Sequence, residues 1–337
     1  MIIVMNSSAT RQDIDNLESK LSSLGFKTHP IYGSVKTVIG AIGDKRLINT
    51  QTLLTMPGVE KIVPIMKPFK LVGRELKQID TIVEVGDVKI GGDELVVMGG
   101  PCAVENRETF FEIASKVSEA GAKILRGGAY KPRTSPYSFQ GLEEEGLKIM
   151  AEAREQTGLK IITEVIDTRD VELVSSYTDI IQIGARNMHN FRLLQESGQS
   201  GKPVFLKRGI SATIEEWLMA AEYIMDAGNK NIILCERGIR TYETSTRNTL
   251  DISAIPVVKE LSHLPIIVDP SHASGNWKYV SALSKGAIAA GADGLIIEVH
   301  TNPESAMSDG QQSLIPKNFS ELINELKPVA GAVGRSI

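Results

Sequence analysis

The sequence of 337 residues is poor in several features, and each scarcity narrows what the protein can be. It has only two cysteines, Cys102 and Cys235, so we expect no disulfide framework, and a reducing cytoplasm fits best. No apolar run reaches the roughly 20 residues that a membrane-spanning helix needs. The N-terminus has no basic segment followed by a long apolar one, so we expect no secretory signal. The formal net charge of −4 provides no overall basic field for nucleic acid or an anionic membrane.

Eight short apolar runs, separated by segments of helix length, are the most informative pattern that is present. They are LVVMGG, AKILRGG, KIITEV, DIIQIGAR, PVFLKRG, NIILCERG, PIIVDPSH and GLIIEVH. Eight buried strands alternating with helices predict an α/β fold, a closed (β/α)8 or TIM barrel. In that fold the chemistry lies at the C-terminal ends of the strands, where these runs carry cations, carboxylates, a cysteine and a histidine.

Residues 1–66 precede the barrel and are predicted to form a separate small domain. IIVM, KTHPIYG, VKTVIGAIG and the end of MPGVEKIVPIM have the pattern of strands, with a turn at residues 33–34. Helices are expected from Thr10 to Leu24 and around residues 46–55. The order βαββαβ is typical of a ferredoxin-like α+β domain. Residues 67–80 then form a polar linker, and residues 81–337 hold an N-terminal hairpin and the barrel.

Four residues near the ends of the first, seventh and eighth barrel strands carry side chains that bind metals. They are Cys102, His272, Glu298 and Asp309. A thiolate, an imidazole and two carboxylates suit a borderline divalent ion such as Mn, Fe, Co or Zn. Each has a structural explanation when taken alone, since a cysteine can be a small buried residue and a histidine can cap a helix. Because strands one and eight are neighbours in a closed barrel, their joint placement favours one metal site.

Cations are concentrated at the same strand ends. They are Arg126, Lys131, Arg133, Arg186, Lys207, Arg208, Arg237 and Arg240. Such side chains recognise phosphate and carboxylate groups. One or two of them, with Arg208 and Arg240 as the candidates, are expected to lie only at the barrel rim. The loop at residues 125–141, LRGGAYKPRTSPYSFQG, adds hydroxyl and backbone donors that suit a phosphate.

Six of these segments together resemble the 3-deoxy-D-arabino-heptulosonate 7-phosphate (DAHP) synthase family. They are LRGGAYKPRTSPYSFQG, IQIGARN, FLKRG, ILCERGIRT, VDPSH and IIEVH with the following SDGQQS. The resemblance runs from the linker nearly to the C-terminus, and the short N-terminal domain resembles one subtype. It implies an aldol-type condensation of phosphoenolpyruvate with erythrose 4-phosphate, the first step of the shikimate pathway.

The resemblance also implies roles for individual residues. Cys102, His272, Glu298 and Asp309 match the family's metal ligands. The residues that match its phosphoenolpyruvate contacts are Arg126, Lys131, Arg186, Lys207 and Arg237. The residues that match its erythrose 4-phosphate contacts are Arg133, Thr134 and Ser135. Lys131 stands between the two substrate motifs, and either it or a metal-bound water is interpreted as the proton-handling group. The catalytic set is Lys131, Cys102 and His272.

The N-terminal domain is implied by the same resemblance to be an ACT-like regulator. Feedback inhibition by tyrosine or phenylalanine and a homotetramer are expected on that basis. His29, after the first helix, is a candidate effector contact, although an exposed polar residue on a strand explains it equally well.

Three alternatives are weighed against this interpretation. The nearest is 3-deoxy-D-manno-octulosonate 8-phosphate (KDO8P) synthase, which uses arabinose 5-phosphate and whose loop resembles KANRS where this chain has KPRTS. A Schiff-base aldolase would use Lys207 as its nucleophile. A non-catalytic effector-binding protein is disfavoured because all four candidate metal ligands are present.

Overall fold

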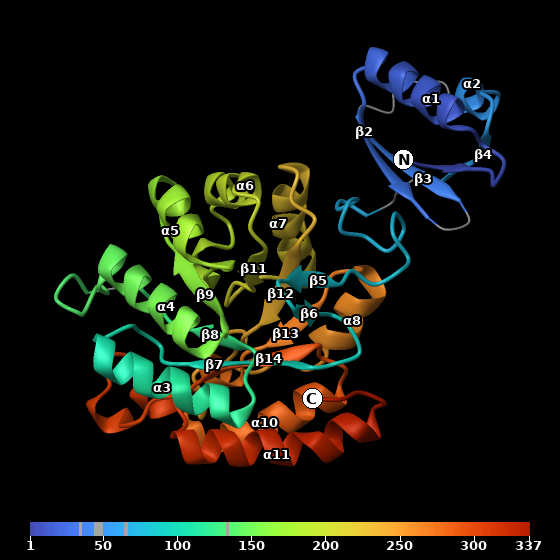
Figure 1. Cartoon of the computed structure of the whole chain (residues 1–337). Helices are drawn as coiled ribbons and strands as arrows, with labels where there is room; N and C mark the ends of the chain where they lie inside the picture. The colour runs from blue at the N-terminus through green and yellow to red at the C-terminus, as the bar shows by residue number, and fades with distance from the viewer. Residues whose placement is uncertain (34–35, 44–49, 64–66, 133–134) are drawn as a thin grey trace. The chain divides into compact units, whose positions relative to one another are not determined.

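The computed structural model describes residues 1–33, 36–43, 50–63, 67–132 and 135–337. The chain divides into two compact units, residues 1–79 and residues 80–337. Each unit has its own apolar core, and Figure 1 shows the helices and strands of both units.

The first unit is a ferredoxin-like domain, as predicted. Its elements are β1 (Ile2–Met5), α1 (Arg11–Ser23), β2 (Lys27–Tyr32), β3 (Thr37–Ile42), α2 (Thr50–Leu54) and β4 (Val59–Val63). The strands pair antiparallel in the order β2-β3-β1-β4. Helix α1 begins where the sequence indicates, because Thr10 and Asp13 form a capping box. Residues 34, 46–49 and 64–66, which belong to the predicted turn, second helix and last strand, lie outside the described residues.

Apolar residues on α1 and on the sheet form the core of this unit. Ile14, Leu17 and Leu21 of α1 recur at helical spacing and are buried with Ile3 and Ile39 of the central strands. The segment that follows β4 belongs to the same compact unit. Its Leu76 lies against Gly40 of β3, where an added Cβ atom would lie 3.0 Å from the leucine side chain.

The second unit is a closed barrel of eight parallel strands, which confirms the predicted fold class. The strands are β7 (Val96–Gly100), β8 (Ile124–Arg126), β9 (Lys160–Val165), β10 (Ile180–Ile183), β11 (Val204–Lys207), β12 (Ile232–Glu236), β13 (Ile266–Val268) and β14 (Gly294–Glu298). β14 pairs with β7 and closes the barrel. The strands that begin and end the barrel in sequence are therefore neighbours in space.

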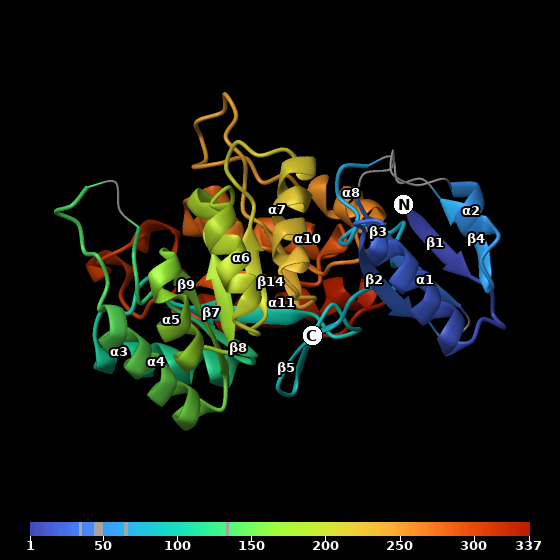
Figure 2. The same ribbon diagram turned by 90° about the horizontal axis from the view of Figure 1, so that it is seen from above.

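Helices surround these strands (Figure 2). They are α3 (Arg107–Ala120), α4 (Glu143–Thr157), α5 (Val171–Tyr177), α6 (Phe191–Gln199), α7 (Ile214–Asp226), α8 (Ala254–Leu261), α10 (Trp277–Ala289) and α11 (Pro316–Ala332). The short helix α9 (Pro270–Ser274) directly follows β13. Thr213 and Glu216 form a capping box at the start of α7.

The predicted hairpin, β5 (Val83–Val85) and β6 (Val88–Ile90), precedes the first barrel strand. Its buried valines and isoleucine share one core with residues near the starts of the strands, such as Ile124 and Ile180. The hairpin therefore fills the N-terminal end of the barrel, which leaves the C-terminal end for the site.

Candidate active site

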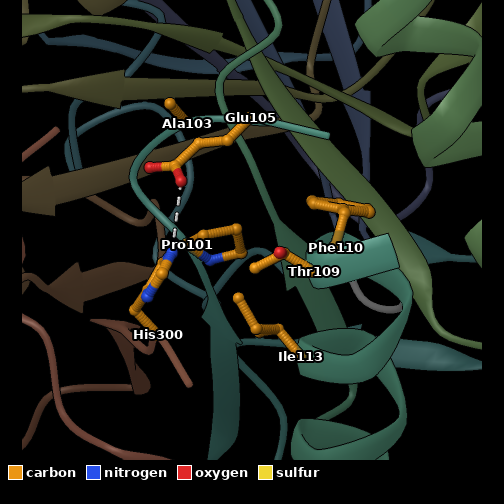
Figure 3. Close-up of a pocket in the computed structure, with 7 residues that line it drawn as sticks. All are labelled: Pro101, Ala103, Glu105, Thr109, Phe110, Ile113 and His300. Atoms are coloured by element: carbon orange, nitrogen blue, oxygen red, sulfur yellow. Dashed lines mark ion pairs between the residues drawn. The ribbon is translucent and has the colours of Figure 1, made fainter. Parts of the chain in front are cut away.

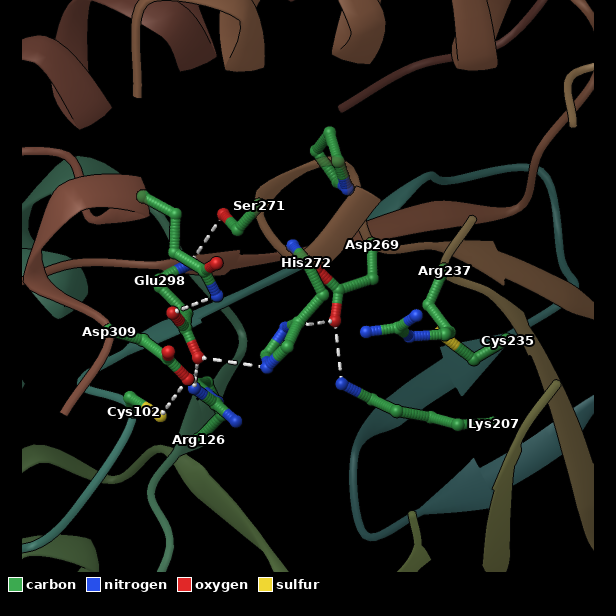
Figure 4. A network of polar contacts seen from close by, with 12 residues as sticks. Cys102, Arg126, Lys207, Cys235, Arg237, Asp269, Ser271, His272, Glu298 and Asp309 are labelled. Carbon is green, nitrogen blue, oxygen red and sulfur yellow. Dashed lines mark hydrogen bonds and ion pairs between the residues drawn. The ribbon is translucent and has the colours of Figure 1, made fainter. Parts of the chain in front are cut away.

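Four side chains meet at the C-terminal end of the barrel. Cys102 follows β7, His272 lies on α9, Glu298 ends β14, and Asp309 lies in the loop after β14. Each offers one ligand atom, and these atoms all lie within 4.8 Å of one another (Figure 4). The structure thus brings together the four residues that the sequence analysis singles out as candidate metal ligands.

The contacts within this four-residue cluster show which atoms face inward. The Sγ atom of Cys102 lies 3.2 Å from Oδ2 of Asp309. The Nε2 atom of His272 lies 3.4 Å from Oε1 of Glu298. One sulfur, one ring nitrogen and two carboxylate oxygens therefore point to a common centre.

Two backbone features place these ligands. At Gly100, φ is 149°, and an added Cβ atom would lie 2.0 Å from the carbonyl oxygen of Arg126, so only glycine fits where the chain turns toward Cys102. Asp309 has a φ of 53°, in the left-handed region that few residues other than glycine adopt. Unusual backbone conformations of this kind are often found at functional sites.

The protonation of the cluster suits a divalent cation. Burial lowers the pKa of His272, which favours the neutral imidazole that a metal ion needs as a ligand. Burial favours the neutral acids, but His272 and Arg126 lower the pKa of Glu298, and His272 and Arg247 lower the pKa of Asp309 to about 2. Burial, together with Glu298, raises the pKa of the Cys102 thiol to about 11. A neutral imidazole and two carboxylates are ready ligands, and the thiol would lose its proton to a bound metal.

Four of the five cations predicted to hold phosphoenolpyruvate are buried beside the cluster. Arg126, Lys131, Lys207 and Arg237 are each less than 10% exposed. Arg126 donates to Oε1 of Glu298 at 2.6 Å, and its Nε atom has no hydrogen-bond partner among the described residues. Such buried donors are costly to leave unsatisfied, which favours an anionic ligand.

Lys131 contacts the cluster directly. Its Nζ atom donates to Sγ of Cys102 at 3.0 Å and to the backbone carbonyl of Cys102 at 2.8 Å. It comes from the loop after β8, whereas Cys102 follows β7, so the two neighbouring strand ends are joined by this contact.

Asp269 connects another cation with the cluster. Its Oδ2 atom lies 2.6 Å from Nζ of Lys207 and 2.8 Å from Nδ1 of His272. A carboxylate on the far nitrogen of a metal-binding histidine orients the ring. The same contact commits the Lys207 side chain to a buried carboxylate, which does not suit the free amine that a Schiff-base aldolase needs.

Arg186 and Ser135, one of the predicted erythrose 4-phosphate residues, lie in more open positions. Arg186 is exposed on a 3-10 turn after β10, and its guanidinium donates to the carbonyl of Pro132 at 2.7 Å. Ser135 is exposed in the same loop as Pro132. Arg133 and Thr134 lie outside the described residues.

Arg208 does not lie at the rim, where it was expected, and this prediction is wrong. It is 4% exposed, and its NH1 atom pairs with Glu236 at 2.9 Å and Asp251 at 2.8 Å. Arg208 follows Lys207 directly, and side chains of successive strand residues point to opposite sides. Arg208 therefore anchors the end of β11 to the end of β12. Arg240, the other expected rim residue, is exposed.

Sequence reasoning missed several residues that hold the ligand loops together. Glu105 accepts a hydrogen bond from the Met307 backbone at 2.6 Å, and His300 Nε2 lies 3.4 Å from its other carboxylate oxygen (Figure 3). This pair joins the loop that holds Cys102 to the loop that holds Asp309. Two further residues contact the carboxylates of the four-residue cluster. Gln312 donates to Glu298, and Arg247 donates to Asp309. Gln312 belongs to the SDGQQS segment, but no sequence signal marks Arg247.

His29, the candidate effector contact, lies in the first unit. It is on β2, opposite Gly40 of β3, and is partly buried. In the described part of the chain, no helix has the length and apolar character to cross a membrane.

Comparison with known proteins gives a consistent family assignment. Residues 74–332 match the model of the DAHP synthetase I family, and residues 1–67 match that of the DAHP synthase ferredoxin-like domain. A phospho-2-dehydro-3-deoxyheptonate aldolase of Thermotoga maritima is 52% identical over 99% of both chains. A 2-dehydro-3-deoxyphosphooctonate aldolase of Desulfotalea psychrophila is 32% identical, over 73% of this chain and 94% of that protein.

Solved structures agree with these matches. A crystal structure of the Thermotoga maritima aldolase, described as a DAHP synthase, superposes with a TM-score of 0.80 at 51% identity, covering 99% of this chain and 98% of that one. A truncated form of the Thermotoga maritima DAHP synthase has a TM-score of 0.75 at 52% identity, covering 80% of this chain and 98% of that one.

Proposed function

This chain belongs to the DAHP synthetase I family and is an enzyme of that class, and we propose that it condenses phosphoenolpyruvate with erythrose 4-phosphate in a metal-dependent reaction. The products would be DAHP and inorganic phosphate. The observation that carries the proposal is the four-residue cluster of Cys102, His272, Glu298 and Asp309 with buried cations around it. A mixed sulfur, nitrogen and oxygen donor set fits Mn, Fe, Co or Zn.

The buried cations would bind the first substrate. Arg126, Lys131, Lys207 and Arg237 offer positive charge in a site largely shielded from water, where it interacts strongly with a phosphate and a carboxylate. Arg186 would complete the set from the loop side. Held in this way, phosphoenolpyruvate presents its C3 atom to the aldehyde carbon of the second substrate, and the entropic cost of bringing two molecules together is reduced.

The second substrate would bind to the loop after β8. Arg133, Thr134 and Ser135 are the proposed contacts of its phosphate. The metal, held by the four-residue cluster, would act as a Lewis acid for the aldehyde oxygen. After the carbon–carbon bond forms, water adds at C2 and phosphate leaves, while the cations offset the negative charge that develops.

Lys131 is the proposed proton-handling residue. Its ammonium lies 3.0 Å from the Cys102 sulfur and comes from the loop that continues into residues 133–135. A donor placed between the two substrates can protonate the oxygen that becomes an alcohol. A lysine with three donor hydrogens can do so while it still binds phosphoenolpyruvate.

The N-terminal unit is proposed to regulate the barrel. Residues 1–66, joined by residues 67–80 to the barrel of residues 81–337, would bind tyrosine or phenylalanine, with His29 as a candidate contact. A homotetramer is the proposed assembly. The match of residues 1–67 to the DAHP synthase ferredoxin-like domain supports this division of roles.

The octulosonate synthase is the second candidate, because relatives of that name align with the barrel. The one from Desulfotalea psychrophila covers 73% of this chain at 32% identity, whereas the heptonate aldolase of Thermotoga maritima covers 99% at 52% identity. The higher identity and the fuller coverage favour erythrose 4-phosphate, the four-carbon aldehyde, as the second substrate.

Phosphoenolpyruvate consumption tests both candidates. Erythrose 4-phosphate and arabinose 5-phosphate are supplied in parallel, before and after chelation and with metal added back. We expect turnover with erythrose 4-phosphate that is lost on chelation and restored by metal. Turnover only with arabinose 5-phosphate would move the assignment to the octulosonate synthase, and activity after thorough chelation would refute the metal site.

A further inference from the structure

Both carboxylates of the four-residue cluster are held by their outer oxygens. Oε2 of Glu298 accepts a hydrogen bond from Nε2 of Gln312 at 2.7 Å, and Oε1 faces His272. Oδ1 of Asp309 accepts from NH1 of Arg247 at 3.2 Å, and Oδ2 faces Cys102. Each carboxylate thus presents one oxygen to the centre and is held through its other oxygen, and Arg126 also donates to Oε1 of Glu298 at 2.6 Å.

A single contact connects the two anchors. NH1 of Arg247 also donates to Oε1 of Gln312 at 2.9 Å. A guanidinium can only donate, so it sets the orientation of the Gln312 amide, with the oxygen toward Arg247 and the nitrogen toward Glu298. Gln312 is 2% exposed, so solvent does not compete for its bond to Glu298.

Arg247 is itself fixed by the backbone beside His272. The backbone N–H of Arg247 donates to the Ser274 carbonyl, and that of Asn248 donates to the Ala273 carbonyl. The side chain of Asn248 donates to the His272 carbonyl at 3.1 Å. The segment after β12 is therefore attached to α9, and Arg247 extends from it to Asp309 and Gln312 in the loop after β14.

We propose that Gln312 and Arg247 are positioning residues that hold Glu298 and Asp309 with one oxygen each toward a divalent ion and thereby set the affinity of the site for that ion. This inference rests on the proposed metal site. Hydrogen bonds to the outer oxygens keep the two carboxylates from rotating. Metal binding then does not have to fix their orientation. Hydrogen-bond partners of metal ligands typically contribute about 10- to 100-fold in metal affinity.

Cobalt binding to the full chain, freed of metal by chelation, tests the proposal without any measurement of turnover. Co²⁺ bound to a cysteine thiolate absorbs in the near ultraviolet, so a titration yields both the dissociation constant and a signal for the Cys102 bond. The variants are Gln312→Leu, Arg247→Met and Arg247→Lys. The matched controls are Gln311→Leu, at the exposed neighbouring glutamine, and Arg192→Met, at an exposed arginine on α6.

We expect Gln312→Leu and Arg247→Met each to weaken Co²⁺ binding by about 10-fold or more, with the thiolate absorbance at saturation retained. Arg247→Lys should recover part of the loss, and both controls should match the unchanged protein. The double variant should lose less than the product of the two single effects, because the residues act through one connected path.

Two results would overturn the inference, and each identifies a different error. If the unchanged protein shows thiolate absorbance and the Arg247 and Gln312 variants bind Co²⁺ equally well, the positioning role is wrong and the metal site stands. If the unchanged protein shows no such absorbance, the metal site itself fails. Arg247 is 40% exposed, so its variants are expected to fold even if Gln312→Leu does not.

Discussion

The ammonium of Lys131 lies 3.0 Å from the sulfur of Cys102, although the two residues follow different barrel strands. This contact places the proposed proton-handling residue at the edge of the proposed metal site. It also makes the role of Lys131 testable apart from the other cations.

Replacement of Lys131 by methionine removes the ammonium and keeps a side chain of similar length. We expect kcat to fall by about 10²- to 10⁴-fold, because a general acid contributes about that much. The measurement is steady-state kinetics at saturating concentrations of both substrates. Lys317→Met, at an exposed lysine on α11, is the control. If Lys131→Met raised only KM and kept kcat, Lys131 would serve in binding alone.

Replacement of Arg208 by methionine should destabilise the barrel. The change leaves the buried Glu236 carboxylate without its cation, and loss of one partner of a buried ion pair costs about 3–5 kcal/mol. Both tryptophans, Trp217 and Trp277, lie in the barrel, so the denaturant midpoint of tryptophan fluorescence follows this unit alone. The exposed Arg240→Met should leave the midpoint unchanged, and an equal midpoint for Arg208→Met would contradict the anchoring role.

Glu105 is expected to stabilise the two loops that it joins. Glu105→Ala removes the acceptor of the Met307 backbone N–H, at a cost of about 0.5–1.5 kcal/mol in the free energy of unfolding. Glu105→Gln retains an oxygen acceptor and should lose much less. The same fluorescence midpoint measures both, with the exposed Glu112→Ala of α3 as control. Equal effects of the alanine and glutamine variants would show that the acceptor is unimportant.

Removal of the N-terminal unit should separate regulation from catalysis. Leu76 packs against Gly40 within the first unit, so deletion of residues 1–66 alone would leave Leu76 without that contact. We therefore expect deletion of residues 1–79 to give a more soluble barrel than deletion of residues 1–66. The shorter protein should keep turnover and lose inhibition by tyrosine or phenylalanine. His29→Ala in the full chain tests the candidate contact. Inhibition that survives the deletion, or a full chain that neither amino acid inhibits, would refute the regulatory role.

Much of the barrel could be predicted because its signals are local. Eight apolar runs separated by helical segments permit few other folds, and a closed parallel barrel brings the ends of its strands to one face. Cys102 and Glu298 could be expected to meet for this reason, since they follow strands that pair when the barrel closes. The capping residues Thr10 and Thr213 were also readable, because a cap and its partner are three residues apart.

The direction in which each cation points could not be predicted in the same way. Lys207 and Arg208 are adjacent basic residues, yet Lys207 pairs with Asp269 while Arg208 pairs with Glu236 and Asp251. These carboxylates lie 28 to 62 positions away along the chain. No local pattern states which of them a long side chain will reach.

The sequence by itself determined the two domain types, the barrel and the kinds of side chain at its C-terminal end, because strand periodicity and helix caps are properties of neighbouring residues. Only the tertiary structure decided how those side chains pair. Barrel closure and loop packing brought Gln312 and Arg247 to Glu298 and Asp309, and burial shields the contact between Gln312 and Glu298 from solvent.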